Sequence, residues 1–203
     1  MSLEQRLTQF DPAVRPPALP DGDVSYTVDD TGVGRMLLAV RADGAVVASS
    51  FAPDAAAEDA VLTRIAARVS PRVLRKAAPT DALRRQLEEF LTGRRRDFDL
   101  RTDLALAGDF QRSVLTRLAA TVPYGARTTY GALAADLGRP TASRAVGAAL
   151  GANPLCVVLP CHRVVAASGA LTGYAGGLAV KERLLTLESP PSPGGQSEAW
   201  ARR

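Results

Sequence analysis

The order of the secondary-structure patterns is the feature that most constrains the fold of this chain. Three short runs with strand-like composition come first, at residues 24–28, 35–41 and 45–51. Turn signals at residues 29–32 and 42–44, each containing a glycine, separate them. Most of the later periodic segments have the apolar spacing of helices. Because strands followed by helices form segregated layers, the pattern predicts an α+β fold.

Capping residues mark the start of three predicted helices. Asp54, Asp81 and Asp109 each precede a segment with helical apolar spacing, and we expect each to cap its helix. Gly93 is expected to end the second of these helices. The residues expected to be buried are Val61, Ile65, Val69, Leu83, Leu87, Phe90, Leu91, Phe110, Val114, Leu115 and Leu118.

Two short helices are predicted at residues 129–138 and 142–150, with Thr141 as the cap of the second. A tight turn between short helices fits a DNA-binding helix-turn-helix and also an ordinary helical hairpin. In the second helix Arg144 is the only long charged residue among alanines and glycines. A reader of base edges normally carries several long polar side chains. We therefore expect a sequence-independent contact in which Arg144 inserts into a gap.

Composition and charge divide the chain into four predicted parts. These are an extended arm at residues 1–21, a domain at 22–103, a second domain at 104–188 and a disordered tail at 189–203. The net charge is +4, and residues 104–188 carry eight basic and four acidic residues, whereas the remainder is balanced. This concentration favours a polyanionic partner.

Several classes of protein are disfavoured by what the sequence contains. We find no apolar run long enough to span a bilayer and no signal-peptide pattern near the first residue. Two cysteines five residues apart do not make a disulfide framework, and one histidine with two cysteines is too few for a zinc site. We therefore expect a cytoplasmic protein that needs no metal, no cofactor and no membrane.

The most reactive residues follow an apolar run at residues 155–159, which predicts a buried strand. Cys161 comes two residues after this run, and the only histidine, His162, follows it directly. This pairing is typical of a nucleophile, because a thiol with a pKa of about 8.5 needs a base or a positive charge nearby. Neighbours on a strand point to opposite faces, so we expect the two to meet through water or a local bend. Cys156, inside the run, is expected to be a packed apolar residue.

A glycine-rich loop at residues 168–177 precedes a predicted helix at 178–187. Its spacing does not match a phosphate-binding loop, and we favour a wall for a flat ligand. Glu188 follows the helix and would complete a Cys-His-Glu relay if it oriented His162. A solvated glutamate at a helix end is the commoner alternative.

Six motifs together resemble one family. They are Val122-Pro123-Tyr124-Gly125, Thr129-Tyr130-Gly131, Arg144-Ala145-Val146-Gly147, Asn153-Pro154, Pro160-Cys161-His162-Arg163-Val164, and Gly173-Tyr174 with Gly176-Gly177. In this order and spacing they resemble the methylated-DNA–protein-cysteine methyltransferases, also called O6-alkylguanine-DNA alkyltransferases. The resemblance is dense over residues 104–188 and only architectural over 22–103. It implies an N-terminal antiparallel sheet with helices, and a mainly helical, winged-helix-like C-terminal domain with a helix-turn-helix.

The resemblance implies an activity: irreversible transfer of an alkyl group from O6 of guanine in double-stranded DNA to Cys161, once per molecule. It implies that His162 deprotonates Cys161 through a bound water and that Glu188 orients His162. Asn153 would be the hinge that ties the helix-turn-helix to the active-site segment. The expected protein is a monomer, with cooperative binding along DNA left open.

Further roles are implied for residues that would contact the flipped nucleotide and the DNA. Tyr130 would turn the phosphate 3′ to the target and hydrogen-bond guanine N3, and Arg144 would fill the vacated stack. The other implied DNA contacts are Thr129, Ala145, Gly147 and Ala148. The implied guanine pocket consists of Val164, Leu171, Tyr174, Ala175 and Gly176. Ala175 departs from the serine of many members, and Lys181 matches a lysine usually found near the site.

Two other classes of function remain open from the residues alone. One is a lesion-binding or regulatory module that flips a base without transferring its alkyl group. The other is a Cys-His-Glu hydrolase acting on a small acyl or amide substrate. The presence of Cys161 and His162 favours transfer over the first, and the Arg144 helix is unexplained by the second.

Overall fold

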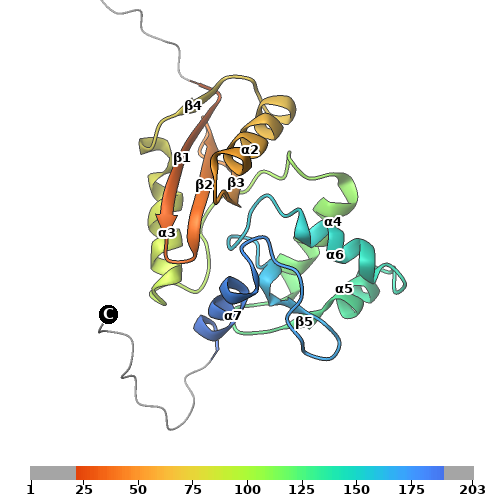
Figure 1. Cartoon of the computed structure of the whole chain (residues 1–203). Coiled ribbons are helices and arrows are strands. Elements are labelled where there is room, and N and C mark those ends of the chain that lie inside the picture. The colour runs from red at the N-terminus through yellow and green to blue at the C-terminus, as the bar shows by residue number, and fades with distance from the viewer. Residues whose placement is uncertain (1–21, 190–203) are drawn as a thin grey trace, which may run out of the picture.

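The structure is a computed structural model that describes residues 22–189 (Figure 1). The expected arm at 1–21, and the expected tail beyond its first residue, lie outside the described residues. Strands β1 (Val24–Thr31), β2 (Gly34–Arg41), β3 (Val46–Phe51) and β4 (Val73–Arg75) form one sheet in the order β3-β2-β1-β4. The three strand-like runs therefore form strands, and the α+β fold is confirmed.

The sheet differs from the expected antiparallel one at its edge. β1 pairs antiparallel with β2, and β2 with β3, but β4 pairs parallel with β1. Sequence patterning missed β4 because it has only three residues, two of them exposed. A strand this short shows no alternation that could be recognised.

Alternation along β2 places helices on both faces of the sheet. Leu37 and Ala39 pack in one buried cluster with Ile65 of helix α2 (Ala55–Arg68). Met36, Leu38 and Val40 face the other way and share a second cluster with residues of helix α3 (Asp81–Leu91). A one-turn 3-10 helix, η1 (Ala78–Thr80), precedes α3. Since successive strand residues point to opposite faces, both sides of the sheet are apolar.

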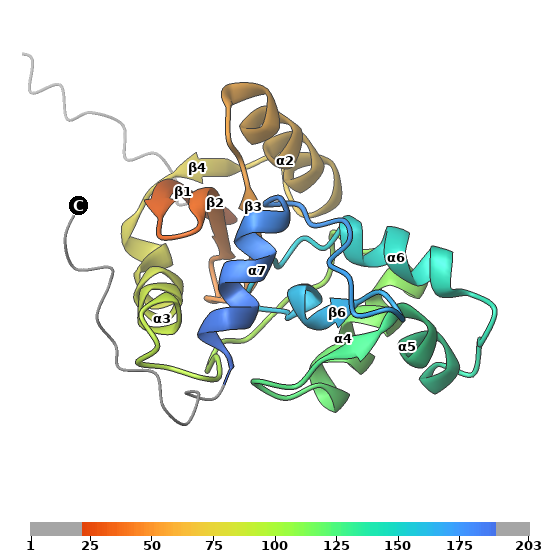
Figure 2. The ribbon, with the colours of Figure 1, turned by 60° about the horizontal axis from the view of Figure 1, so that its bottom comes forward.

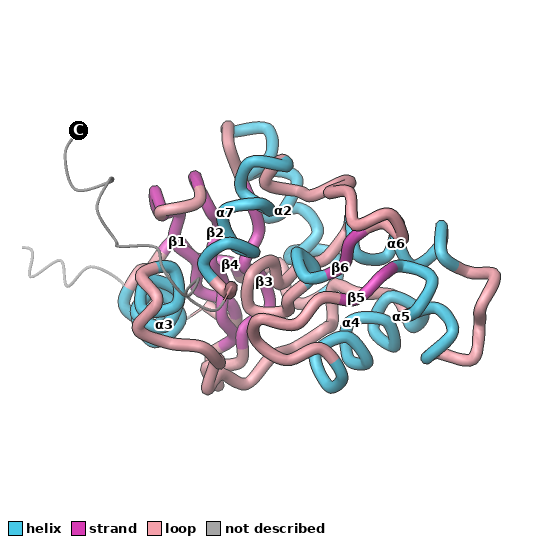
Figure 3. The backbone as a smooth tube through the Cα atoms, turned by 90° about the horizontal axis from the view of Figure 1, so that it is seen from below, coloured by secondary structure: helices cyan, strands magenta, loops and turns pink. Residues whose placement is uncertain are grey.

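The remaining helices form a second group (Figures 1 and 3). They are α4 (Asp109–Thr121), α5 (Tyr130–Asp136) and α6 (Ser143–Gly151), with α7 (Leu178–Leu187) between this group and the sheet (Figure 2). Two short parallel strands, β5 (Thr128–Thr129) and β6 (Val164–Val165), and the 3-10 turn η2 (Cys161–Arg163) complete the fold. Within residues 22–189 no helix is both long and apolar enough to cross a bilayer.

The expected helix caps are right at one position and wrong at three. The Asp54 carboxylate accepts a hydrogen bond of 2.8 Å from the backbone N–H of Ala57 and caps α2. Asp81 and Asp109 are instead the first residues of α3 and α4, and no side chain caps these helices. Thr141 lies too far before α6, which begins at Ser143. Sequence patterns locate a helix start only to within one or two residues.

The predicted strand at 155–159 is wrong, although its burial is right. The N–H of Leu159 donates to the carbonyl of Leu155 at 2.8 Å, so the segment closes into a turn. Val157 has φ 72°, a left-handed conformation that a β-branched residue rarely adopts. All five residues of the segment are buried. An apolar run identifies the interior but not the backbone path when the segment has no full ladder to join.

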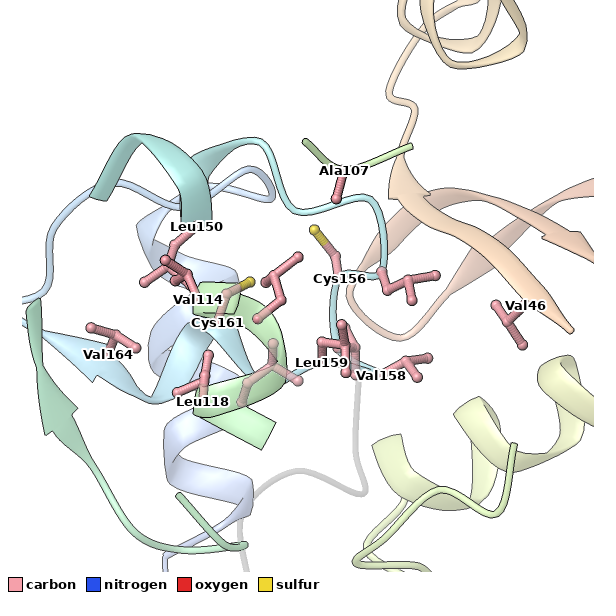
Figure 4. Packing of buried hydrophobic residues seen from close by; sticks show 14 of the residues in the cluster. Val46, Ala107, Val114, Leu118, Leu150, Cys156, Val158, Leu159, Cys161 and Val164 are labelled. Carbon is pink, nitrogen blue, oxygen red and sulfur yellow. The ribbon is translucent and has the colours of Figure 1, made fainter. Parts of the chain in front are cut away.

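A single buried cluster reaches across the predicted boundary at residue 103. It contains Leu87 and Phe90 of α3 together with Val114 and Leu118 of α4. Figure 4 shows Cys156, Val158 and Leu159 of the 155–159 turn between Val46 on one side and Leu118 on the other. The division into two domains stays a prediction, since one core serves both parts.

Replacing Asp54 tests the one helix cap that was predicted from the sequence and is present in the structure. Asp54→Ala leaves the Ala57 N–H without its acceptor, and we expect the free energy of unfolding to fall by about 1 kcal/mol. Thr141→Ala is the matched control, because its side chain caps nothing, and its change should stay within about 0.5 kcal/mol. Urea unfolding measures both, and equal losses would contradict the capping geometry.

Candidate active site

Asn153 organises the turn that carries Cys161. Its Nδ2 donates to the Cys161 thiol sulfur and to the Leu159 carbonyl, at 3.1 Å each. Its Oδ1 accepts from the N–H of Leu155 at 2.9 Å. One amide therefore holds both ends of the buried 155–159 turn and the thiol that follows it. The Asn153 side chain is itself buried, which limits its alternatives.

The surroundings of Cys161 favour its thiolate. Interaction with the neighbouring Cys156 thiol lowers the pKa of Cys161 most, and burial opposes this effect. The Asn153 amide and the positive charge of Lys181 lower the pKa further. Interaction with Cys161 and burial raise the pKa of Cys156 well above its usual value, so Cys156 stays a thiol. Cys156 is packed as expected, but it also stabilises its neighbour's charge.

His162 is fully buried and oriented by a carboxylate. Its Nε2 lies 2.9 Å from Oε1 of Glu188. Burial, with repulsion from Arg163 and Lys181, outweighs the attraction of Glu188 and lowers the pKa of His162. The neutral imidazole donates its Nε2 proton to Glu188, which leaves a lone pair on Nδ1. That Nδ1 is buried and has no hydrogen-bond partner among residues 22–189.

Glu188 joins three segments through its buried carboxylate. Besides His162, it accepts from Nε and Nη2 of Arg163 at 2.9 to 3.1 Å. Burial opposes its charge, but the hydrogen bonds from His162 and Arg163 hold the pKa of Glu188 below its ordinary value. Nη1 of Arg163 donates to the Val122 carbonyl at 2.8 Å. The end of α7, the turn η2 and the 122–125 segment are thus fixed together.

A cavity of about 600 Å³ lies at the start of α5 and α6, and its lining includes Tyr174, whose ring centre is 6.4 Å from that of His162. Its lining includes Tyr130, Arg144 and Gly147, together with Tyr174 and Ala175 of the glycine-rich loop. The expected pocket residues Val164, Leu171 and Gly176 are not among the lining residues, and neither is Cys161. Val164 is fully buried, and Cys161 is 5% exposed.

The expected DNA contacts lie on one side of α6 and at the start of α5. Arg144, Ala145 and Ala148 are exposed. Gly147 faces the Tyr130 ring, and a Cβ atom at position 147 would lie 3.7 Å from ring carbons of Tyr130. The Oγ1 of Thr129 accepts from the N–H of Ala132 at 3.1 Å and caps α5. α5 and α6 therefore present small residues and one arginine around the cavity.

Lys181 anchors the glycine-rich loop. It is fully buried, and its Nζ donates to the Thr172 carbonyl at 2.7 Å. The Thr172 hydroxyl donates to the Tyr130 hydroxyl at 3.2 Å, and the Tyr130 hydroxyl donates to the Thr172 carbonyl at 3.4 Å. The Lys181 ammonium lies 5.9 Å from the centre of the Tyr130 ring. One buried cation thus holds the loop against α5.

Two supporting residues were missed as site residues. Arg163 donates to Glu188, and its position directly after Cys161 and His162 was the available signal in the sequence. Tyr124 donates its hydroxyl to the Leu187 carbonyl at 3.0 Å, and the Arg163 guanidinium lies 5.9 Å from its ring centre. Nothing in its own sequence neighbourhood points to Leu187, which is 63 residues away.

Comparison with known proteins matches this part of the chain to one family. The model of the 6-O-methylguanine DNA methyltransferase DNA-binding domain matches residues 109–190. The chain is 32% identical to the crystal structure of Mycobacterium tuberculosis OGT in complex with DNA, with a TM-score of 0.68, covering 82% of this chain and 96% of that one. The chain belongs to the methylated-DNA–protein-cysteine methyltransferase family.

Curated relatives match over a shorter segment. A methylated-DNA–protein-cysteine methyltransferase of Mycolicibacterium paratuberculosis is 49% identical over 108 residues, which are 53% of this chain and 64% of that protein. One of Methanosarcina acetivorans is 50% identical over 105 residues, 51% of this chain and 65% of that protein. The match thus spans slightly less than two thirds of each relative. All residues given site roles above lie within the segment 109–190 that the family's domain model matches.

The buried carboxylate is testable by an isosteric change. Glu188→Gln leaves the Arg163 guanidinium buried without a counter-ion, and we expect a loss of about 3–5 kcal/mol in the free energy of unfolding. Because the pKa of Glu188 is lowered on folding, its stabilisation should be complete above pH 4.5 and disappear as the pH falls through the lower folded value.

Thermal and urea unfolding at several pH values measure this loss. The matched control is Asp43→Asn, which removes a carboxylate from an exposed pair with Arg101 and should change stability little. Similar losses for the two variants would contradict the structural role of Glu188.

Proposed function

We propose that this chain repairs alkylated DNA directly, by moving an alkyl group from O6 of guanine in duplex DNA onto Cys161, once per molecule. The observation that carries the proposal is the Cys161 thiol, which has a lowered pKa, accepts a hydrogen bond from Asn153 and adjoins the His162–Glu188 pair. Membership of the family supplies the substrate class, because a related protein was solved in complex with DNA.

The reaction is a displacement at the carbon bonded to O6. The Cys161 thiolate attacks this carbon, a C–S bond forms, and the C–O6 bond breaks with its electron pair leaving on guanine. His162 is suited to take the thiol proton through water, because its Nδ1 is the unprotonated nitrogen of a neutral imidazole. The Tyr130 hydroxyl would donate to guanine N3 and stabilise the charge that develops there. A thioether resists hydrolysis, so Cys161 is not regenerated.

Access to the O6 carbon requires that the base leave the stack. Stacking hides this atom in the duplex, and flipping costs a few kcal/mol. The cavity of about 600 Å³ beside α6 would take the base, and the exposed Arg144 on its rim would fill the gap in the DNA. The small side chains of Ala145, Gly147 and Ala148 allow α6 to approach the duplex closely. Ala175 would offer its backbone N–H to guanine in place of a serine hydroxyl.

Replacing each of the two buried cysteines tests the acceptor. Cys161→Ala should abolish transfer of a labelled methyl group from a duplex containing O6-methylguanine, and should leave binding of that duplex intact. Cys156→Ala is the matched control: it should still accept the methyl group on Cys161, but more slowly at neutral pH, since it loses the neighbouring thiol whose interaction lowers the pKa of Cys161.

The outcome also separates the other classes of function. Transfer that survives in Cys161→Ala would remove Cys161 as the acceptor. A wild-type protein that binds the lesion without becoming labelled would favour a lesion-binding module. Turnover of a small acyl substrate without DNA would favour the hydrolase.

Arg144 provides a test of base flipping. Arg144→Ala should slow methyl transfer from duplex DNA about tenfold or more, because nothing then occupies the vacated stack. Reaction with O6-methylguanine as the free base needs no flipping and should be nearly unchanged. Arg64→Ala, an exposed arginine on α2, is the control and should alter neither rate. Equal slowing with the duplex and the free base would contradict a flipping role.

A further inference from the structure

The N-terminal sheet reaches the glycine-rich loop through one aromatic residue. Phe51, the last residue of β3, lies edge-on to Tyr174, with ring centres 5.6 Å apart and planes at 72°. Tyr174 is in turn edge-on to His162, with centres 6.4 Å apart at 82°. Edge-to-face pairs at such distances are attractive. Three rings therefore connect the sheet to the histidine beside Cys161.

Gly176 shows how closely Phe51 approaches this loop. A Cβ atom at position 176 would lie 2.6 Å from Cζ of Phe51, which is closer than real contacts allow. Gly173 and Gly177 have positive φ angles of 26° and 86°, so their backbone conformation favours glycine. Gly176 has no such angle. The ring of Phe51 therefore leaves no room for a side chain at position 176.

The strand that carries Phe51 is fixed to the segment that carries Asn153. The N–H of Ser49 and the hydroxyl of Ser50 both donate to the Pro154 carbonyl, at 2.9 and 3.2 Å. The Ser49 hydroxyl donates to the Cys156 carbonyl at 2.7 Å. In Figure 2 the beginning of α7, where the glycine-rich loop ends, lies beside β3. β3 thus contacts both the turn before Cys161 and the loop that lines the cavity.

We propose that Phe51 is a positioning residue for the guanine pocket: it holds the Tyr174–Gly176 segment of the loop in the conformation that receives the flipped base. Tyr174 and Ala175 line the cavity, so the wall of the pocket depends on a side chain of the N-terminal sheet. The Tyr174 hydroxyl is buried without a partner among the described residues, so it gives the loop no hydrogen bond in place of the ring contact. This inference rests on the proposed function.

The two halves of the site are expected to respond differently to loss of the ring. Asn153 and Cys156 determine the surroundings of the Cys161 thiol. Ser49 and Ser50 hold the segment that carries Asn153 and Cys156 through hydrogen bonds that do not involve Phe51. Phe51→Ala should therefore raise the half-saturating concentration of substrate about five- to tenfold. The maximal rate constant and its pH profile should stay within about twofold of wild type. Phe51→Leu, which keeps an apolar side chain, should show a smaller rise.

The experiment measures single-turnover methylation of Cys161 against substrate concentration, with duplex O6-methylguanine and with the free base. Ile65→Ala is the control for stability, because Ile65 is fully buried on the opposite face of the sheet and does not reach the loop. It should lower the melting temperature and leave the half-saturating concentration unchanged. If Phe51→Ala gives this same result, or lowers the maximal rate without changing half-saturation, Phe51 does not position the pocket.

Gly176→Ala gives an independent test, because the added methyl group at position 176 would displace the Phe51 ring from the loop side of the same contact. Both single changes displace the same contact, so the double variant should be no worse than the poorer single variant. Independent, multiplying effects would overturn the proposal, and so would a Gly176→Ala protein with wild-type half-saturation. Failure of the proposed function is distinguishable, because in that case the wild-type protein itself would not be methylated.

Discussion

The carboxylate of Glu188 is the group on which the arrangement of the site depends. It is almost fully buried, and it is tolerated there because two cationic or polar partners, Arg163 and His162, surround it. Through these contacts the end of α7 is tied to the turn that begins with Cys161. Arg163 extends the connection to the Val122 carbonyl. A buried charge cluster of this kind fixes position more than it adds stability, because its desolvation cost is large.

Electrostatic interactions give the neighbouring residues Cys161 and His162 different protonation states. Burial keeps His162 neutral, and Glu188 decides which of its nitrogens carries the proton. The Cys156 thiol, the Asn153 amide and the Lys181 charge together favour the thiolate of Cys161 in an interior that would otherwise oppose it. Lys181 also holds the loop through Thr172, so one buried ammonium serves both the thiol and the wall of the cavity.

Local patterns in the sequence predicted much of the fold. Three of the four strands of the sheet and the helices through Val61, Leu87 and Val114 were predictable because period-2 and period-3.6 patterns report which face is buried. The path of residues 155–159 was not predictable, since burial on all sides is equally compatible with a strand and a tight turn. Helix caps failed where the aspartate was one residue inside the helix, as at Asp81.

The site was predictable to the extent that it is contiguous. Cys161 and His162 stand out as neighbours, but His162 and Glu188 are 26 positions apart and only the fold brings them together, so family resemblance was needed to pair them. Phe51 and Ser49 lie more than a hundred residues before their partners at the site, and their own surroundings read as ordinary strand. Contacts of this range follow from how α7 and β3 pack, which no local pattern encodes.

The central claim is that Cys161 receives the alkyl group and keeps it. Intact-protein and peptide mass spectrometry, after mixing the wild-type protein with a duplex bearing one O6-methylguanine, tests this most directly. The account predicts a gain of one methylene on the peptide containing Cys161, saturating at one per molecule however much substrate is added. An unmodified Cys161 peptide in the presence of bound lesion, or continued turnover beyond one per molecule, would contradict it.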